Sequence, residues 1–203
     1  NQIIHSLAKV SPEMVRSALV NSGLFGEFRL AQNFPPRSDI KQILRYFARN
    51  GAGQNAELSS LDNAVDEIES RQLEAIVAQN NREVSYQFVM PFYDSDPVDI
   101  HFERGRGDFR KGEVDWVINL HTNSDWLGEV WSKTTIKASS DIEMIFWAAS
   151  EEAAKLAANG QEQLSNILND FRLSLTKFVV LNAQRPVIDP SLSGPGQVLD
   201  VST

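Results

Sequence analysis

The stretch from Ser124 to Ile136, SDWLGEVWSKTTI, decides how the rest of the chain is interpreted. It begins with a short polar turn, continues with a Leu-Gly step, and ends in a run with the two-residue period of a β-strand. The positions that share one face of this strand are only half apolar: Val130, Ser132, Thr134 and Ile136. Because hydroxyls stand where a core strand would carry valine, the pattern predicts a strand at the margin of a sheet, and Gly128 allows a sharp turn at its start.

Four further runs with the same period predict that this strand belongs to a β-sheet. Their alternate positions are Val84, Tyr86, Phe88 and Met90, then Val98, Ile100 and Phe102, then Trp116, Ile118 and Leu120, and last Ile142, Met144 and Phe146. Short polar turns connect consecutive runs, as in antiparallel sheets. The sequence therefore predicts an antiparallel meander with one buried face.

The segment after the fifth run predicts a helix that covers the buried face. Ser150 is a suitable N-cap, and Glu151 and Glu152 place negative charge where the helix dipole favours it. An apolar stripe follows at helical spacing: Ala153, Leu156, Ala157, Gly160, Leu164, Ile167, Leu168 and Phe171. We therefore expect one long helix over the sheet, followed by a last strand at Phe178–Leu181.

The first 80 residues have the apolar spacing of helices. Four helices are predicted, which begin after Ser11-Pro12, at Leu24, at Ser38 and near Ser59. From residue 185 onward the chain is rich in Pro, Gly and Ser, which is typical of a disordered tail. The expected fold is α+β: a helical module at residues 1–80, a mainly antiparallel sheet covered by one long helix at 81–184, and a tail at 185–203.

The composition excludes several classes of protein. The 203 residues include no cysteine, which excludes disulfide bonds, thiolate chemistry and cysteine-ligated zinc. The net charge of −8 argues against nucleic-acid binding, because affinity for phosphates needs clustered Lys and Arg. The one basic cluster lies in a glycine-broken stretch typical of a hairpin loop: Arg104, Arg106, Arg110 and Lys111.

The sequence carries no recognisable targeting segment. No apolar run approaches the roughly 18 residues of a transmembrane helix, and the start lacks the zones of a signal peptide. We therefore expect no membrane insertion. Because the chain begins with Asn1 rather than Met, we expect it to be a piece of a longer or processed protein.

The strongest candidate for catalysis is an acidic cluster around the second run: Asp94, Asp96, Asp99, His101 and Glu103. Oxygen and imidazole ligands bind divalent metal ions, so a metal-dependent hydrolase is one alternative function. Strand geometry, however, places Asp99, His101 and Glu103 opposite the apolar positions, where solvated side chains are expected. Asp94 and Asp96 flank a turn, which favours Asp for local hydrogen bonds. The sequence therefore predicts no enzyme, metal or cofactor.

Tryptophans indicate a binding surface instead. Strand parity places Trp131 and Trp147 on the face opposite the apolar stripes. Exposed aromatic clusters commonly mark protein interfaces, and packing under a loop is the alternative. A structural assembly protein, such as a tail or baseplate component, is a further alternative function.

Six short motifs stand in a characteristic order along the chain. They are SGLFGEFRLAQ (22–32), IESRQLEAIVAQ (68–79), IHFERG (100–105), LGEVWSKTTI (127–136), FWAAS (146–150) and VLNAQRP (180–186). In this order they resemble the C-terminal region of bacterial flagellar hook-length control proteins of the FliK type. The similarity extends over roughly residues 13–186.

The resemblance implies a function in export rather than in catalysis. Proteins of this family are exported by the flagellar type III apparatus, and their C-terminal domain acts on the export gate. The implied partner is the cytoplasmic domain of the gate protein of the FlhB type, with hook and hook-cap proteins as further candidates. Binding switches export from rod and hook subunits to filament subunits, so the implied location is the cytoplasm, followed by export.

The family's most characteristic stretch reads Leu-x-Pro-x-x-Leu-Gly before a strand. Leu127 and Gly128 match the Leu-Gly step and Val130 an apolar position, whereas Ser124 replaces the proline. We therefore expect the partner-binding residues in this stretch: Trp126, Leu127, Gly128, Val130 and Trp131. For the side chains of Leu127 and Val130, packing in the core is the alternative.

Arg172 is a second departure, because the family usually has a glycine between the long helix and the last strand. A glycine there takes the left-handed conformation that ends many helices. Since arginine in that conformation costs about 1 kcal/mol, we expect a longer helix or a differently shaped exit.

Overall fold

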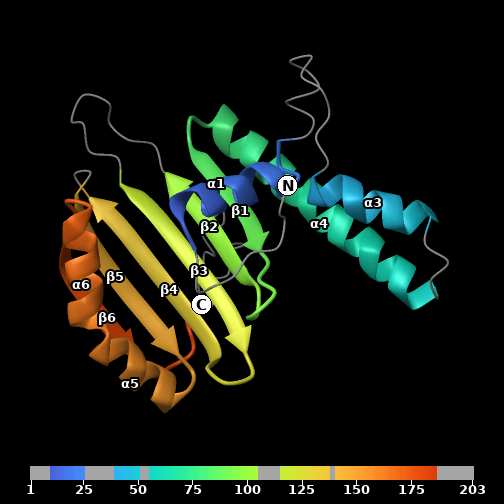
Figure 1. Cartoon of the computed structure of the whole chain (residues 1–203). Helices are drawn as coiled ribbons and strands as arrows, with labels where there is room; N and C mark the ends of the chain where they lie inside the picture. Colours follow the sequence, from blue (N-terminus) through green and yellow to red (C-terminus); the bar gives the residue numbers. More distant parts are fainter. Residues whose placement is uncertain (1–9, 26–38, 51–54, 105–114, 138–139, 187–203) are drawn as a thin grey trace, which may run out of the picture.

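The computed structural model of the chain describes residues 10–25, 39–50, 55–104, 115–137 and 140–186. Within these ranges five helices and a six-stranded sheet form the expected α+β fold (Figure 1). The helices are α1 (Pro12–Asn21), α3 (Ile40–Asn50), α4 (Asn55–Asn80), α5 (Glu151–Asn159) and α6 (Gln161–Asp170). The strands are β1 (Val84–Met90), β2 (Val98–Arg104), β3 (Trp116–Ser124), β4 (Gly128–Lys137), β5 (Asp141–Ala148) and β6 (Ser174–Leu181).

The sheet has the order β1-β2-β3-β4-β5-β6. Each of the first five strands pairs antiparallel with its sequence neighbour, which confirms the predicted meander. The last strand, β6, pairs parallel with β5, because the chain crosses over through α5 and α6 before it returns. The described sheet is therefore mainly antiparallel, with β1 and β6 at its two edges.

The prediction that the strand after Gly128 lies at the margin of the sheet is wrong. β4 lies between β3 and β5, and its hydroxyl side chains Ser132 and Thr134 are buried. In the register of the sheet, Ser132 stands between Leu120 and Phe146. Small side chains in this strand leave room for large ones in the two neighbouring strands, since a core is filled by total volume.

Ser132 and Ser124 are two buried serines with opposite expected effects on stability. Ser132 Oγ has no hydrogen-bond partner among the described residues, whereas Ser124 Oγ accepts a hydrogen bond from Leu127 N at 3.1 Å. A buried polar group without a partner loses its solvation, so Ser132→Ala should raise the free energy of unfolding by about 1 kcal/mol. The matched variant Ser124→Ala should lower it by about 1 kcal/mol. Urea unfolding of both variants measures the two changes, and a destabilised Ser132→Ala protein would contradict the first.

The two ends of the sheet's buried face are covered by different helices. On the β1–β2 half, Ala18 of α1 packs against Phe88, Met90 and Ile100. On the other half, α5 packs on β5 and β6, and α6 on β6. Figure 1 shows α1 lying across the first half and α5 and α6 beside the second. The buried core therefore has two parts on one face of the sheet.

Helices α3 and α4 pack on each other, and α4 also packs on the edge strand β1. The helical residues before the sheet thus contact it through both α1 and α4. The predicted helix after Leu24 falls mainly on residues 26–38, outside the described ranges, as do Arg106, Arg110, Lys111 and tail residues 187–203. None of the helices in the described part of the chain is long and apolar enough to cross a membrane.

The single long helix predicted after Ser150 is two helices, α5 and α6, that meet at Gly160. Gly160 has φ −79° and ψ −4°, and its N–H is shared between the carbonyls of Leu156 and Ala157. Glycine is a poor helix former, so the direction changes there. The predicted stripe is only partly buried: Ala153 is buried, but Leu156 before the break and Ile167 and Phe171 after it are exposed by 56%, 48% and 67%.

Arg172 takes the left-handed conformation, with φ 61°. The N–H of Leu173 donates to Leu168 O at 3.0 Å, and the N–H of Arg172 donates to Asn169 O at 2.9 Å. This pair of bonds is a Schellman motif, and it satisfies two carbonyls at the end of α6. The helix therefore ends where a glycine would end it, and the expected longer helix or different exit does not occur.

Replacing Arg172 by glycine should stabilise the protein. Glycine has no Cβ to clash in the left-handed region, so we expect the free energy of unfolding to rise by about 1 kcal/mol. This corresponds to roughly 2–4 °C in melting temperature for a chain of this size. The control is Asp170→Gly, inside the last turn of α6, which should cost about 1 kcal/mol. An Arg172→Gly protein that melts below the unmodified protein would contradict the reasoning.

Candidate functional site

A row of polar and aromatic side chains crosses the face of the sheet opposite the core, which we call the outer face. The register pairs Asp99 of β2 with His121 of β3, His121 with Trp131 of β4, and Trp131 with Trp147 of β5. Directly paired residues have neighbouring side chains on the same face. Strand parity had predicted the outer position of Asp99, Trp131 and Trp147, and the structure confirms it.

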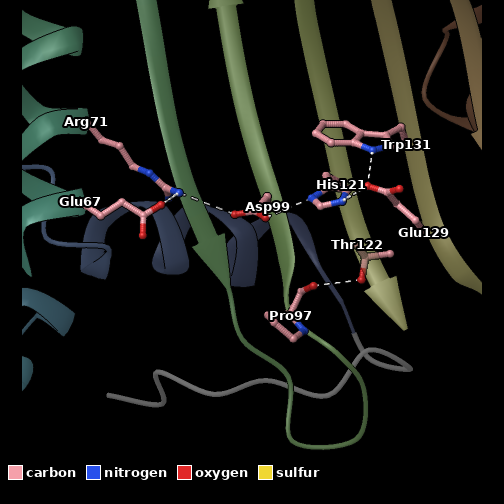
Figure 2. Close-up of polar contacts among 8 residues, drawn as sticks. All are labelled: Glu67, Arg71, Pro97, Asp99, His121, Thr122, Glu129 and Trp131. Carbon is pink, nitrogen blue, oxygen red and sulfur yellow. Dashed lines mark hydrogen bonds and ion pairs between the residues drawn. The ribbon is translucent and has the colours of Figure 1, made fainter. Parts of the chain in front are cut away.

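His121 is the centre of this row. Its ring stacks on Trp131 with a centroid distance of 3.8 Å. Nδ1 lies 3.4 Å from Asp99 Oδ2, and Nε2 lies 3.3 Å from Glu129 Oε1. Trp131 Nε1 donates to the same Glu129 oxygen at 3.2 Å (Figure 2). Both nitrogens of the imidazole therefore face carboxylates, and the indole is fixed by a ring on its face and a carboxylate at its edge.

The row continues into helix α4 on the far side of β1. Figure 2 shows Arg71 reaching from α4 toward Asp99, and its Nη2 atom lies 3.9 Å from Asp99 Oδ1. Arg71 also pairs with Glu67 one turn earlier on the helix. Thr122 Oγ1 donates to Pro97 O at 3.0 Å and ties β3 to the turn before β2. The charged network thus joins the helix to the sheet.

These side chains surround a groove of about 350 Å³ on the outer face, which we call the outer groove. It is lined by Arg71, Gln87, Asp99, His101, Glu103, Asn119, His121, Trp131 and Arg185. His101 is held by two neighbours, because one ring nitrogen lies 2.9 Å from Ser85 Oγ and the other 3.0 Å from Glu103 Oε1. The lining therefore combines carboxylates, imidazoles, amides, arginines and one indole.

Asn119 is the most buried residue of the groove, with 7% of its surface exposed. Its Oδ1 atom has no hydrogen-bond partner among the described residues. A buried acceptor without a partner is unusual in folded proteins and costs about 1–3 kcal/mol of lost solvation. Asn119 therefore places a buried amide oxygen without a partner among the described residues beside the groove.

Arg185 lies over the two tryptophans at one end of the groove. Its Cζ atom is 4.9 Å from the centre of the Trp131 ring and 5.8 Å from that of Trp147. Residues 182–186, which we call the strap, follow β6 and bring this arginine over β4 and β5. Asn182 Nδ2 fixes the start of the strap by donating to Ala148 O at 3.1 Å. The contact is a cation–π interaction with a pair of rings.

The five residues predicted to bind a partner have different positions. Trp126 is 73% exposed at the turn between β3 and β4, and Gly128 starts β4 with φ 69°. Val130 is buried, and Leu127 packs against the same core as Ala148. Trp131 alone lies in the outer groove. Leu127, Gly128 and Val130 therefore shape the turn and its support, while Trp126 and Trp131 present aromatic rings on the surface.

The acidic cluster proposed from the sequence divides in a similar way. Asp99, His101 and Glu103 line the outer groove, as their parity predicts. Asp94 and Asp96 lie in the turn between β1 and β2. In the part of the chain that the structure describes, no group of three or more His, Asp or Glu side chains is arranged to hold a metal ion.

Five residues that line the groove were not identified from the sequence: Arg71, Gln87, Asn119, His121 and Arg185. Asn119 and His121 share the outward parity of their strand, so the alternation around Ile118 and Leu120 was a usable signal. Arg71 and Arg185 come from the helix before the sheet and the strap after it, and no local pattern connects them to the groove. Comparisons of the chain with protein-family models, curated proteins and solved structures found no match.

Proposed function

We propose that this chain is a protein-binding module that controls flagellar hook length and switches type III export. Its partner is the cytoplasmic domain of the export-gate protein, as the order of the six sequence motifs implies. The observation that carries a binding function is the pairing of Trp131 with Trp147 on the outer face. Interfaces are enriched in tryptophan and arginine, and these residues dominate binding energy more often than others.

Backbone geometry at two positions supports the resemblance. The family has a glycine at the Leu-Gly step and another before the last strand, and both places can take positive φ. Gly128 has φ 69°, and Arg172 has φ 61° although it is not a glycine. Ser124, in place of the family's proline, accepts a hydrogen bond from Leu127 N and so tightens the same turn by another means.

The proposal assigns separate roles to the predicted binding residues. Leu127, Gly128 and Val130 support the turn and strand from within, because they pack in the core or set the backbone. Trp126 and Trp131 contact the partner, because one is exposed and the other lines the outer groove.

A genetic experiment tests the function directly. Deletion of the gene in its host should give overlong hooks without filaments, and expression of the full-length protein should restore normal filaments. Normal hooks and filaments in the deletion strain would refute the proposed function.

A binding measurement tests the surface. The purified chain should bind the purified gate domain of the same organism in calorimetry, and Trp131→Ala should weaken binding at least about tenfold, as a central tryptophan does. Tyr93→Ala is the matched control, because Tyr93 is 71% exposed in the turn between β1 and β2 and should leave binding unchanged. A folded Trp131→Ala protein with unchanged affinity would refute the role of this surface.

A further inference from the structure

Arg185 shows which chemistry the outer groove accepts. The side chain is half-buried although it belongs to the strap, and it lies over the Trp131 and Trp147 rings. Among the described residues no carboxylate forms an ion pair with it, so the rings are its principal contact. A guanidinium group stacks on aromatic faces more readily than an ammonium group does, because it is planar and weakly hydrated. The paired indoles are therefore a platform for a guanidinium.

The charge around the groove favours a second cation. Four carboxylates lie in or beside it, on Glu67, Asp99, Glu103 and Glu129, against the two cations Arg71 and Arg185. The carboxylates of this region outnumber its arginines, and the whole chain has a net charge of −8. Complementary charge steers association and selects partners, so a basic group is the favoured ligand.

Asn119 adds a buried acceptor, which a ligand in the groove reaches when the Asn119 side chain turns toward it. It is nine-tenths buried, it lines the groove, and its Oδ1 has no partner among the described residues. A guanidinium has five N–H donors in a fixed plane and can donate to several acceptors at once. An ammonium on a flexible stem lacks both the plane and the stacking surface.

We infer that the outer groove binds an arginine side chain of the protein partner, and that Arg185 is displaced from the tryptophans when it does. This inference rests on the proposed function only for the identity of the partner. The strap holds Arg185 through weak contacts, so it competes with the incoming arginine without excluding it. Arg185 therefore lowers the affinity of the free chain for basic partners.

The experiment uses the full 203-residue chain and three short peptides. The probes are acetyl-Gly-Arg-Gly-amide, the same peptide with lysine, and the same peptide with citrulline, which keeps the shape of arginine without its charge. The readout is the NMR signal of the Trp131 indole N–H, which donates to Glu129 in the free chain. Both the unmodified chain and Arg185→Ala are titrated.

The arginine peptide should shift the Trp131 signal in Arg185→Ala with a dissociation constant about fivefold lower than in the unmodified chain, a factor that one cation–π contact provides. The lysine and citrulline peptides should bind more weakly than the arginine peptide. The substitution Asn119→Ala should lower the affinity of the chain for the arginine peptide. Arg185→Lys keeps the charge but loses the plane, so it should behave like Arg185→Ala.

Three results would overturn the inference: equal binding of arginine and citrulline peptides, equal affinity with and without Arg185, or a Trp131 signal that no peptide moves. The peptides contain no part of the export gate, so this outcome is separate from that of the gate-binding measurement. If the arginine peptide binds but the gate domain does not, the proposed function is refuted and the arginine site still stands.

Discussion

Phe88→Ala should lower the free energy of unfolding by about 3–5 kcal/mol, the usual loss for a fully buried phenylalanine. Phe88 is 2% exposed and stacks on Phe102 with a centroid distance of 6.1 Å. It belongs to the core that Ala18 of α1 shares with β1 and β2. Alanine would leave a cavity at the point where the first helix joins the sheet, so both the lost burial and the cavity contribute.

Thermal and urea unfolding measure this effect. A loss of that size is a large share of the roughly 5–15 kcal/mol that stabilises a typical domain, and it should lower the melting temperature by about 10 °C. Tyr93→Ala removes an exposed aromatic ring and should change stability by less than about 0.5 kcal/mol. A Phe88→Ala protein within 1 kcal/mol of the original would show that α1 does not pack as the structure has it.

Gly23→Ala should lower the free energy of unfolding by about 2–5 kcal/mol, nearly as much as Phe88→Ala, because backbone strain and overpacking both contribute. Gly23 has φ +94°, and a Cβ there would meet Lys41 Cβ at 2.8 Å and Ile68 Cγ2 at 3.3 Å. Lys41 is 4% exposed, and its Nζ donates to Gln72 Oε1 at 2.8 Å, so it has little freedom to move. Gln72 Nε2 also donates to Gly23 O at 2.6 Å. The glycine is thus the contact point of α1, α3 and α4.

Gly160→Ala is the matched control, because it makes the same substitution where space and conformation allow it. The new Cβ would lie 3.5 Å from the carbonyl oxygens of Leu156 and Ala157, which is ordinary contact, and φ is −79°. Alanine there restricts the unfolded chain and should add about 0.4–1 kcal/mol to stability. Equal losses for the two variants would show that Gly23 has no special position.

The period of the apolar residues predicted most of the fold. Alternation placed Phe88, Ile100 and Val130 on the buried face and Trp131 on the outer face, because side chains of a strand point alternately to its two faces. Which strands lie at the edges could not be predicted from alternation. Ser132 and Thr134 suggested an edge, but burial of small residues between larger ones in neighbouring strands is a tertiary effect.

The helical segment between β5 and β6 shows a second limit of prediction from sequence. An apolar stripe at helical spacing continued through Gly160, so the pattern predicted one helix. In the structure one helix ends and another begins at Gly160, and apolar residues on both sides of it, such as Leu156 and Ile167, are exposed. The Asn159-Gly160 pair was a visible signal of the break, because both residues are poor helix formers.

The candidate site was predictable only where it lies on strands. Asp99, His101 and Trp131 follow from parity, and the pairing of Asp99 with His121 follows once the strand register is known. Arg71 and Arg185 enter from elements on either side of the sheet in sequence, and their approach depends on how those elements pack. Contacts between side chains of elements distant in the sequence cannot be predicted from the local spacing of apolar and polar residues.

The parallel pairing of β6 has a consequence for the order in which the molecule assembles. Five strands pair with sequence neighbours and close short loops, whereas β6 must wait for the crossover through α5 and α6. Since the strap follows β6, the cover over the tryptophans is among the last contacts to form. Detachment of this single edge strand would uncover both rings while the other strands stay paired. We therefore expect the fluorescence of Trp131 and Trp147 to change when β6, the last strand of the described residues, pairs with β5.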